Sequence, residues 1–320
     1  MIHRPMHRPL LLAGLLWPSA CLLWVSACAT FHAGAMPGEP RDASYAQVAG
    51  ARVRYVDLAP QQGGKTASTV VLLHGFASSL ETWSGLAPKL VREHRVIALD
   101  LKGFGWTDRP EGDYSPAAQA QLVRELLRQR GVERASVVAH SWGSSVALAL
   151  ALAEPQLVQR VVLYDAWVYD EQLPPFFRWA MLPGVGEALF GLYYKQQPEA
   201  RLALGFYRPE RVPQQLVDDV ERALDRPGTT AAALAAVRGE GFEALEQRYR
   251  QIRQPTLLLW GREDAVSAPH IAERLVRDLP NARLQWFARC GHFPMLEAAA
   301  ASDDAVIGFL QPELVAEGSP

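Results

Sequence analysis

The chain has 320 residues, of which 49% are hydrophobic and 21% are charged, a balance typical of a globular protein with enough material for one large core or two smaller ones. Its formal net charge is −2 and no block of Lys and Arg stands out, which argues against a nucleic-acid partner.

The first 27 residues differ in composition from the rest. Arg4 and Arg8 are the only formally charged side chains there, and they precede an apolar run over residues 10–27. A basic head followed by an apolar segment is typical of an export signal peptide, here residues 1–27. The run is also close to the length of a membrane-spanning helix, so an uncleaved signal anchor stays open. Both alternatives place the remainder of the chain across the membrane.

The apolar run ends in "VSAC", at Cys28. This stretch resembles the lipobox of bacterial lipoproteins, which implies cleavage before Cys28, a lipid on that residue, and a periplasm-facing place in the bacterial cell envelope. Ala29 and Thr30 lack the aspartate that marks retention in the inner membrane, so the resemblance favours the outer membrane. With Cys21 removed and Cys28 lipidated, Cys290 is the remaining thiol and no intramolecular disulfide is possible.

The order of apolar runs predicts the fold class. Residues 28–43 are small, contain Pro and Gly, and are predicted to be a tether. Two short strands follow around Ala49 and Gly50. From residue 69 to about 165, apolar strands alternate with helices. Such strands imply an α/β fold, a mostly parallel sheet with helices on both faces.

The alternation lapses over residues 166–250, a segment rich in aromatic residues with helical patterns between prolines and glycines. We expect a helical cap inserted into the fold rather than a separate domain. Strand and helix alternate again over residues 251–312, which complete the core begun at residue 44, and residues 313–320 form a tail.

Ser141 is the candidate nucleophile. It follows the apolar run "ASVVA" directly and precedes an Ala/Leu-rich helix. Small residues flank it two places away, Ala139 and Gly143, as a sharp strand-to-helix turn requires. A serine in this place can also be a plain helix cap, so the turn alone leaves both roles open.

A serine hydroxyl needs a base to take its proton and an acid to orient that base, and in parallel sheets reactive groups collect at the carboxyl ends of strands. Asp264, in "LLLWGREDAVSAP", follows a strand and is the preferred acid, with Asp165 in "VVLYDAW" as the alternative. His292, in "ARCGHFPMLE", follows the last apolar strand and is the candidate base. The backbone N–H groups of Phe76 and Trp142 are predicted to form the oxyanion hole.

Five motifs in order resemble those of the α/β-hydrolase superfamily, and the resemblance covers residues 44–312. They are "LLHGFASSLETW", "ALDLKGFGWTDRP", "AHSWGSSVALALA", "LLLWGREDAVSAP" and "GHFPMLE". The similarity is greatest to members with a helical lid. Two positions depart from the pattern, Ala139 where glycine is usual and Lys102 where proline is common. The order of Ser141, Asp264 and His292 is that of the superfamily's catalytic triad.

The resemblance implies a serine hydrolase that works through an acyl-enzyme, without a metal or another cofactor. An aromatic-rich cap suggests an apolar pocket, so an apolar or lipid-like carboxylic ester is the expected small-molecule substrate. The same aromatic residues can equally form the cap's own core. Related enzymes with this triad hydrolyse C–C bonds, open lactones or release N-terminal proline, and these stay as alternatives. A periplasmic location argues against the ring-fission products that form inside cells. An alternative of another class is a non-catalytic, lipid-anchored binding protein on the same fold.

Overall fold

The computed structural model describes residues 30–62 and 67–311. The predicted signal peptide, the lipid site at Cys28 and the tail over residues 313–320 lie outside these residues. In the described part of the chain, no helix is both long enough and apolar enough to cross a membrane.

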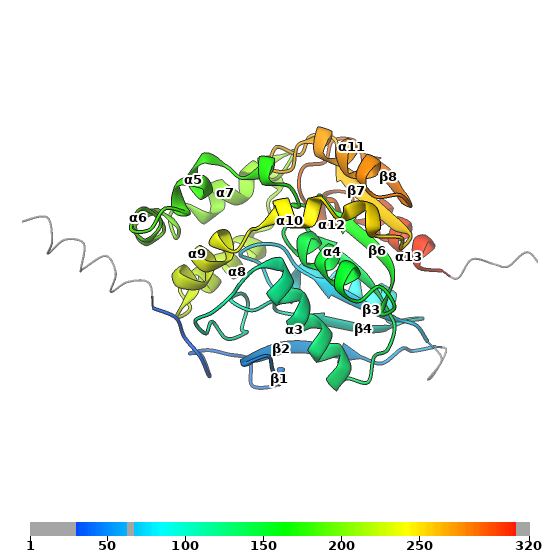
Figure 1. The fold of residues 1–320 in the computed structure, drawn as a ribbon, viewed down its shortest axis with the longest axis horizontal. Coiled ribbons are helices and arrows are strands. Elements are labelled where there is room, and N and C mark those ends of the chain that lie inside the picture. The colour runs from blue at the N-terminus through cyan, green and yellow to red at the C-terminus, as the bar shows by residue number, and fades with distance from the viewer. Residues whose placement is uncertain (1–29, 63–66, 312–320) are drawn as a thin grey trace, which may run out of the picture.

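Eight strands form one sheet in the order β1-β2-β4-β3-β5-β6-β7-β8 (Figure 1). Their bounds are β1 Ser44–Val48, β2 Ala51–Leu58, β3 Thr69–Leu73, β4 Arg95–Leu99, β5 Ala135–His140, β6 Val158–Tyr164, β7 Thr256–Gly261 and β8 Ala282–Phe287. β1 and β2 form an antiparallel hairpin, β2 pairs antiparallel with β4, and every later pairing is parallel. The mostly parallel sheet predicted from the sequence is therefore present.

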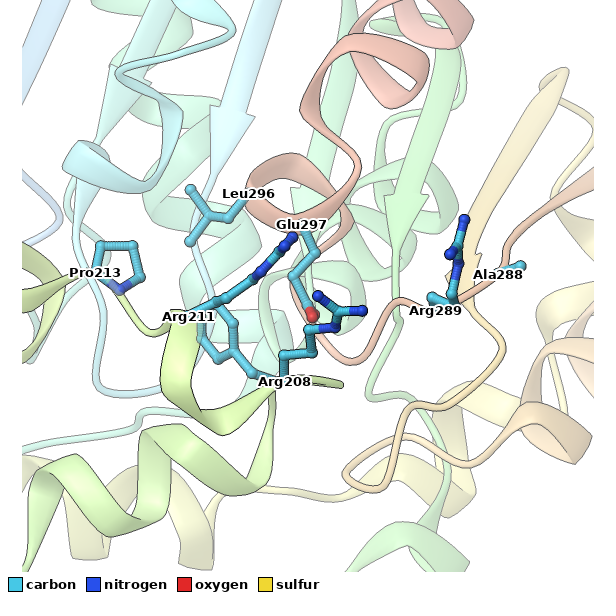
Figure 2. Close-up of a pocket in the computed structure, with 8 residues that line it drawn as sticks. Arg208, Arg211, Pro213, Ala288, Arg289, Leu296 and Glu297 are labelled. Atoms are coloured by element: carbon cyan, nitrogen blue, oxygen red, sulfur yellow. The ribbon is translucent and has the colours of Figure 1, made fainter.

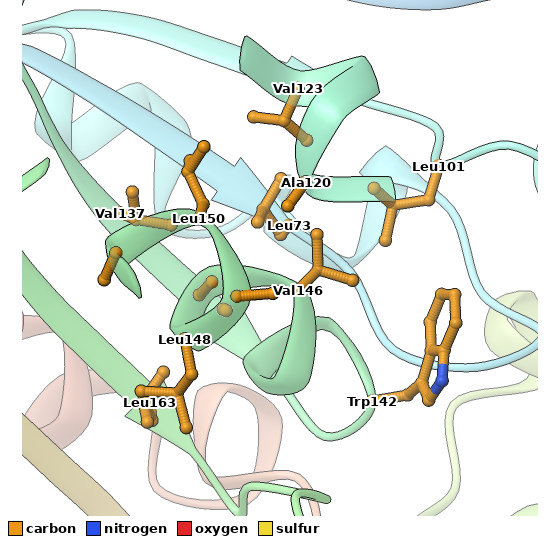
Figure 3. Packing of buried hydrophobic residues seen from close by; sticks show 14 of the residues in the cluster. Leu73, Leu101, Ala120, Val123, Val137, Trp142, Val146, Leu148, Leu150 and Leu163 are labelled. Carbon is orange, nitrogen blue, oxygen red and sulfur yellow. The ribbon is translucent and has the colours of Figure 1, made fainter. Parts of the chain in front are cut away.

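Helices cover both faces of the sheet, and alternate residues of each strand enter different core layers. Val71 and Leu73 of β3 pack in one layer, while Val70 and Leu72 pack in the other. The first layer contains α3 (Pro116–Gln129), α4 (Gly143–Ala153) and α11 (Pro269–Asp278), and Figure 3 shows α4 side chains packed against strand residues. The second contains α2 (Ala87–Leu90), α12 (Pro294–Glu297) and α13 (Ala299–Leu310). This double burial explains why the central strands are apolar throughout.

The segment between β6 and β7 is helical. It contains α5 (Pro175–Ala180), α6 (Val185–Tyr193), α7 (Pro198–Leu204), α8 (Gln214–Leu224), α9 (Thr229–Arg238) and α10 (Phe242–Glu246). Ala180, Phe190 and Leu234 belong to a small separate core within it. The predicted start at residue 166 is early, because residues 166–169 are buried in the main core. Hereafter "the insertion" means residues 170–250.

The described part of the predicted tether, residues 30–43, packs on the body instead of extending from it. His32 and Arg109 exchange two backbone hydrogen bonds of 2.9 and 2.7 Å. Met36 is only 4% exposed, and Glu39 pairs with Arg52 at 2.8 Å. The tether prediction is therefore wrong for this part. These contacts are made to single distant residues, so they leave no periodic pattern in the sequence.

Candidate active site

Ser141 lies at a strained turn between β5 and α4. Its φ of +50° is left-handed, a conformation that residues other than glycine rarely adopt and that is common where a nucleophile is presented. A Cβ on Gly143 would overlap with the carbonyl oxygen of His74, so this position requires glycine. Ala139 is fully buried at the end of β5, and the fold accommodates its methyl group.

The structure brings Ser141, His292 and Asp264 into one hydrogen-bonded chain. The Oγ of Ser141 lies 2.9 Å from Nε2 of His292, and Nδ1 of His292 lies 2.8 Å from Oδ2 of Asp264. All three side chains are buried. The other oxygen of Asp264 accepts the backbone N–H groups of Val266 and Ser267 at 2.7 and 2.9 Å. Asp264 can therefore hold the proton on Nδ1, which leaves Nε2 free to accept the proton of Ser141.

Asp165, the alternative acid, lies behind Asp264 and does not bond to His292. It is fully buried, and its Oδ1 accepts the backbone N–H of Gly261 at 2.9 Å. Burial, together with the nearby Asp264 carboxylate, raises the pKa of Asp165 well above its ordinary range. Polar atoms of Asp165, Asp264 and His292 lie within 4.8 Å of one another. Because Oδ2 of Asp264 and Nδ1 of His292 bond to each other, the cluster suits proton transfer better than metal binding.

The backbone of His292 is held from two sides. Its N–H donates to the carbonyl of Gly205 in the insertion at 2.6 Å, and its carbonyl accepts from Nε2 of His140 at 2.9 Å. Burial, with the nearby imidazole of His292, lowers the pKa of His140 well below its usual value, so its ring is neutral and this bond fixes its tautomer. His140, the residue before Ser141, thus positions the loop that carries His292.

Glu297 joins the His292 loop to the insertion. Its two carboxylate oxygens accept the N–H of Gly291 at 2.8 Å and the N–H of Tyr207 at 2.9 Å. Beside this bridge the rings of Phe206 and Phe293 stack, with centroids 4.9 Å apart. Glu297 was not among the residues predicted from the sequence. Its partner Tyr207 is 90 positions away, and no local pattern marks such a contact.

The two predicted oxyanion donors lie beside the nucleophile. Trp142 directly precedes α4, and Phe76 is in the turn after β3. Within the described residues, neither backbone N–H has a hydrogen-bond partner. Two unused donors at this place can donate hydrogen bonds to an oxygen that becomes negative during the reaction.

A cavity of about 610 Å³ opens onto Ser141 and His292 between the sheet and the insertion. Its walls are mostly apolar, and among the described residues that line it Arg201 alone carries a permanent formal charge. Phe176, Phe177 and Tyr194 of the insertion face this cavity, while Phe190 is buried in the insertion's own core. Tyr194 belongs to that core as well, and Phe176 and Phe177 pack against it, so both alternatives for the aromatic residues apply.

A second cavity of about 380 Å³ lies between the insertion and the loop that precedes His292. Figure 2 shows Arg208 and Arg211 beside Glu297, with Arg289 apart from them. None of Ser141, His292 and Asp264 lines this second cavity, so we place the substrate site in the larger cavity.

The sequence pattern of the α/β-hydrolase fold matches residues 68–299. The chain belongs to this family. An uncharacterised protein of Mycobacterium tuberculosis is 33% identical to this α/β-hydrolase over 263 residues, which cover 78% of this chain and 76% of the relative. The 2-hydroxy-6-oxo-2,4-heptadienoate hydrolase of Pseudomonas putida is 30% identical over 256 residues, covering 76% and 89%.

Among solved structures, the fold is similar to that of CumD, a meta-cleavage product hydrolase of Pseudomonas fluorescens. The TM-score is 0.70 with 26% identity, and the match covers 83% of this α/β-hydrolase and 96% of CumD. The family match supports the expectation of a hydrolase. The characterised relatives are named for other substrates than the carboxylic ester that we expected.

Proposed function

We propose that this α/β-hydrolase cleaves a C–C bond next to a ketone, in an acid of the 2-hydroxy-6-oxo-dienoate class, with Ser141 as nucleophile, His292 as base and Asp264 as orienting acid. The observation that carries the proposal is the hydrogen-bonded chain of these three residues at a mostly apolar cavity that is lined by one permanent cation, Arg201.

The relatives favour this alternative over the carboxylic ester that the sequence led us to expect. The Pseudomonas putida relative is named for such a substrate, and CumD is a meta-cleavage product hydrolase. Substrates of this class carry a carboxylate at one end and a carbon chain or ring at the other. The cavity offers matching surroundings, because Arg201 can pair with the carboxylate while Phe176, Phe177 and Leu224 surround the apolar part.

In the first half of the reaction, His292 takes the proton of Ser141 as Oγ attacks the ketone carbon. The N–H groups of Phe76 and Trp142 stabilise the resulting oxyanion. Cleavage requires the keto tautomer of the substrate, in which the proton of the 2-hydroxyl has moved to the chain carbon beside the ketone and this carbon is saturated. When the oxyanion collapses, the bond between the ketone carbon and this saturated carbon breaks. The electron pair moves into the conjugated acid, which takes the proton from His292.

In the second half, water attacks the acyl-enzyme with His292 as base, and a carboxylic acid leaves. The net change is the addition of one water across one C–C bond. A carbon leaving group is poor unless its charge is delocalised, so the conjugated acid of the substrate is essential. An ester needs no such conjugation, because its alkoxide accepts the His292 proton directly.

The test compares three purified proteins, the wild-type chain and its Ser141→Ala and Arg201→Gln variants, on 2-hydroxy-6-oxo-heptadienoate and on nitrophenyl esters of two to sixteen carbons. We expect kcat/KM to be highest for the dienoate and to vanish in Ser141→Ala. Arg201→Gln should raise KM for the dienoate by roughly tenfold and leave the neutral esters unchanged. Because Arg201 also donates to the backbone carbonyls of Tyr193 and Tyr194, Arg201→Lys serves as the charge-retaining control.

If the protein hydrolyses esters but not the dienoate, the result would indicate a carboxylesterase and contradict C–C cleavage. Ser141-dependent opening of a lactone, with no cleavage of the dienoate, would favour a lactonase. A folded protein that turns over none of these would favour the binding-protein alternative.

We also propose that residues 1–27 direct export and that Cys28 carries a lipid in the cell envelope, as the "VSAC" motif supports. The Cys28→Ser variant of the full chain should lose metabolically incorporated fatty acid. Unchanged membrane attachment without the lipid would favour the signal anchor. Because ring-fission products form inside cells, an exported enzyme of this class would need a dienoate that reaches the periplasm, and the location and the reaction are therefore tested separately.

A further inference from the structure

Helix α6 (Val185–Tyr193) has one charged side chain, Glu187, and is otherwise apolar, although it lies at the surface of the insertion. Its inner side carries Gly186 and Phe190, which are buried together with Tyr194 just beyond the helix. Its outer side carries Val185, Leu189, Leu192 and Tyr193, at the spacing of i, i+4, i+7 and i+8 that forms one stripe along a helix. An apolar stripe normally faces a core, so this stripe needs a partner outside the described residues.

The stripe continues onto the end of α5. Trp179 is 61% exposed and Leu182 is 55% exposed, and α5 packs against α6. We call Trp179, Leu182, Val185, Leu189, Leu192 and Tyr193 the α6 face. Between Trp179 and Tyr194 the one charged side chain is Glu187, and its carboxylate pairs with Arg238 at 2.7 Å. No unpaired charge therefore interrupts this face.

We propose that the α6 face rests on a lipid bilayer. Its composition suits the membrane interface, since Leu and Val enter the acyl region while Trp179 and Tyr193 present amphipathic rings at the level of the headgroups. Arg178 and Lys195 lie directly outside the two ends of the face and pair with Asp170 at 3.3 Å and with Asp225 at 3.7 Å. Charge is therefore balanced at both ends, and the apolar side chains are the main contact with the bilayer.

The course of the chain brings the predicted membrane attachment close to α6. Phe31, near the start of the described chain, lines a cavity of about 380 Å³ together with Glu187 of α6. Figure 1 shows this end of the chain on the same side of the molecule as α6. Cys28 is three residues before Phe31, and a chain spans at most about 3.6 Å per residue, so a lipid on Cys28 would begin within about 11 Å of Phe31. Two attachments that lie close together hold a protein on a membrane far better than one.

A second copy of the chain is the other occupant that an apolar face can take. One experiment separates the two. The full chain, with Cys21 and Cys28 changed to Ser, receives an environment-sensitive nitrobenzoxadiazole label at Leu192→Cys, while the buried Cys290 stays unlabelled. The matched control is Leu58→Cys, since Leu58 is also an exposed leucine but pairs with Val96 at the edge of the sheet opposite the insertion.

With vesicles of phosphatidylethanolamine and phosphatidylglycerol, we expect a blue shift and a loss of iodide quenching at position 192 and neither at position 58. Emission at position 192 that vesicles leave unchanged overturns the proposal. A blue shift in buffer that grows with protein concentration and needs no vesicles also overturns it, in favour of a second copy.

A second measurement uses unlabelled protein with the native cysteines. Leu192→Ser should lower the vesicle-bound to free ratio by roughly tenfold, and Leu58→Ser should not change it. Both variants should hydrolyse a water-soluble substrate as the wild type does, because neither leucine lines the cavity at Ser141. Equal binding of the two variants would contradict the proposed contact.

Discussion

Replacement of Asp165 by Asn tests whether this buried acid is neutral in the native protein. Asp165 is fully buried, accepts one hydrogen bond from the N–H of Gly261, and lies close to the Asp264 carboxylate. Burial raises its native pKa well above the value of about 3.9 for an unfolded aspartate. Asn keeps the acceptor for Gly261 and presents N–H to Asp264, so it imitates the neutral acid.

The number of protons bound by the native and unfolded states decides whether stability rises or falls with pH. Between about pH 4 and the native pKa of Asp165, the native state holds a proton that the unfolded chain has lost. The free energy of unfolding of the wild type therefore falls as the pH rises, by up to about 1.4 kcal/mol per pH unit from this group. The Asn variant lacks this dependence, so its stability relative to the wild type should increase as the pH rises from 5 towards the native pKa of Asp165.

The assay is denaturant unfolding of the wild type, Asp165→Asn and a control, Asp304→Asn, whose side chain is exposed on α13, at several pH values from 5 to 8. Turnover by Asp165→Asn at pH 7 should stay within about threefold of the wild type, because a neutral group has been replaced by another. A stability difference between Asp165→Asn and the wild type that does not change with pH would refute the assignment of a neutral Asp165.

Three further substitutions test the site. Asp264→Asn removes the carboxylate that orients His292, so kcat should fall by roughly 10⁴-fold while the fold persists, and a loss of tenfold or less would show that another acid serves. Glu297→Gln can accept only one of the two N–H groups at the bridge, so kcat/KM should fall about tenfold, whereas the neighbouring Leu296→Ala should have no effect. Gly143→Ala places a methyl group against the His74 carbonyl and should lower both stability and turnover. The control Gly308→Ala has open space around the new methyl group and should be neutral or stabilising. Equal effects of the two substitutions would contradict the close contact at Gly143.

Much of the candidate site could be predicted because each group directly follows an apolar strand. Ser141, Asp264 and His292 come at the carboxyl ends of β5, β7 and β8, which a parallel sheet brings to one edge. Phe76 and Trp142 could also be predicted as oxyanion donors, because the groups that donate are the backbone N–H groups of two turns that follow strands.

The rest depends on contacts between distant segments. Arg201 lines the cavity because of how the insertion folds back, and Glu297 bonds to Tyr207 only after the insertion has docked. Between β3 and β4 the chain forms a 3-10 turn, Leu80–Trp83, and the short α2 instead of one regular helix. The Asp100 carboxylate accepts the N–H of Leu80, and Pro88 lies in the first turn of α2. The spacing of apolar residues shows which face of a helix or strand is buried. It does not show which distant residue contacts that face.

In the proposed mechanism, Ser141 attacks a ketone whose carbon chain is the leaving group. The most direct measurement is single-turnover analysis of the wild type with a 2-hydroxy-6-oxo-dienoate, with trapping of the acyl group on the protein and mass measurement of the peptide that contains Ser141. We predict that the dienoate's absorbance is lost as an acyl group appears on Ser141, and that Ser141→Ala shows neither change. Cleavage of the dienoate by Ser141→Ala at the wild-type rate, or turnover confined to esters, would contradict the account.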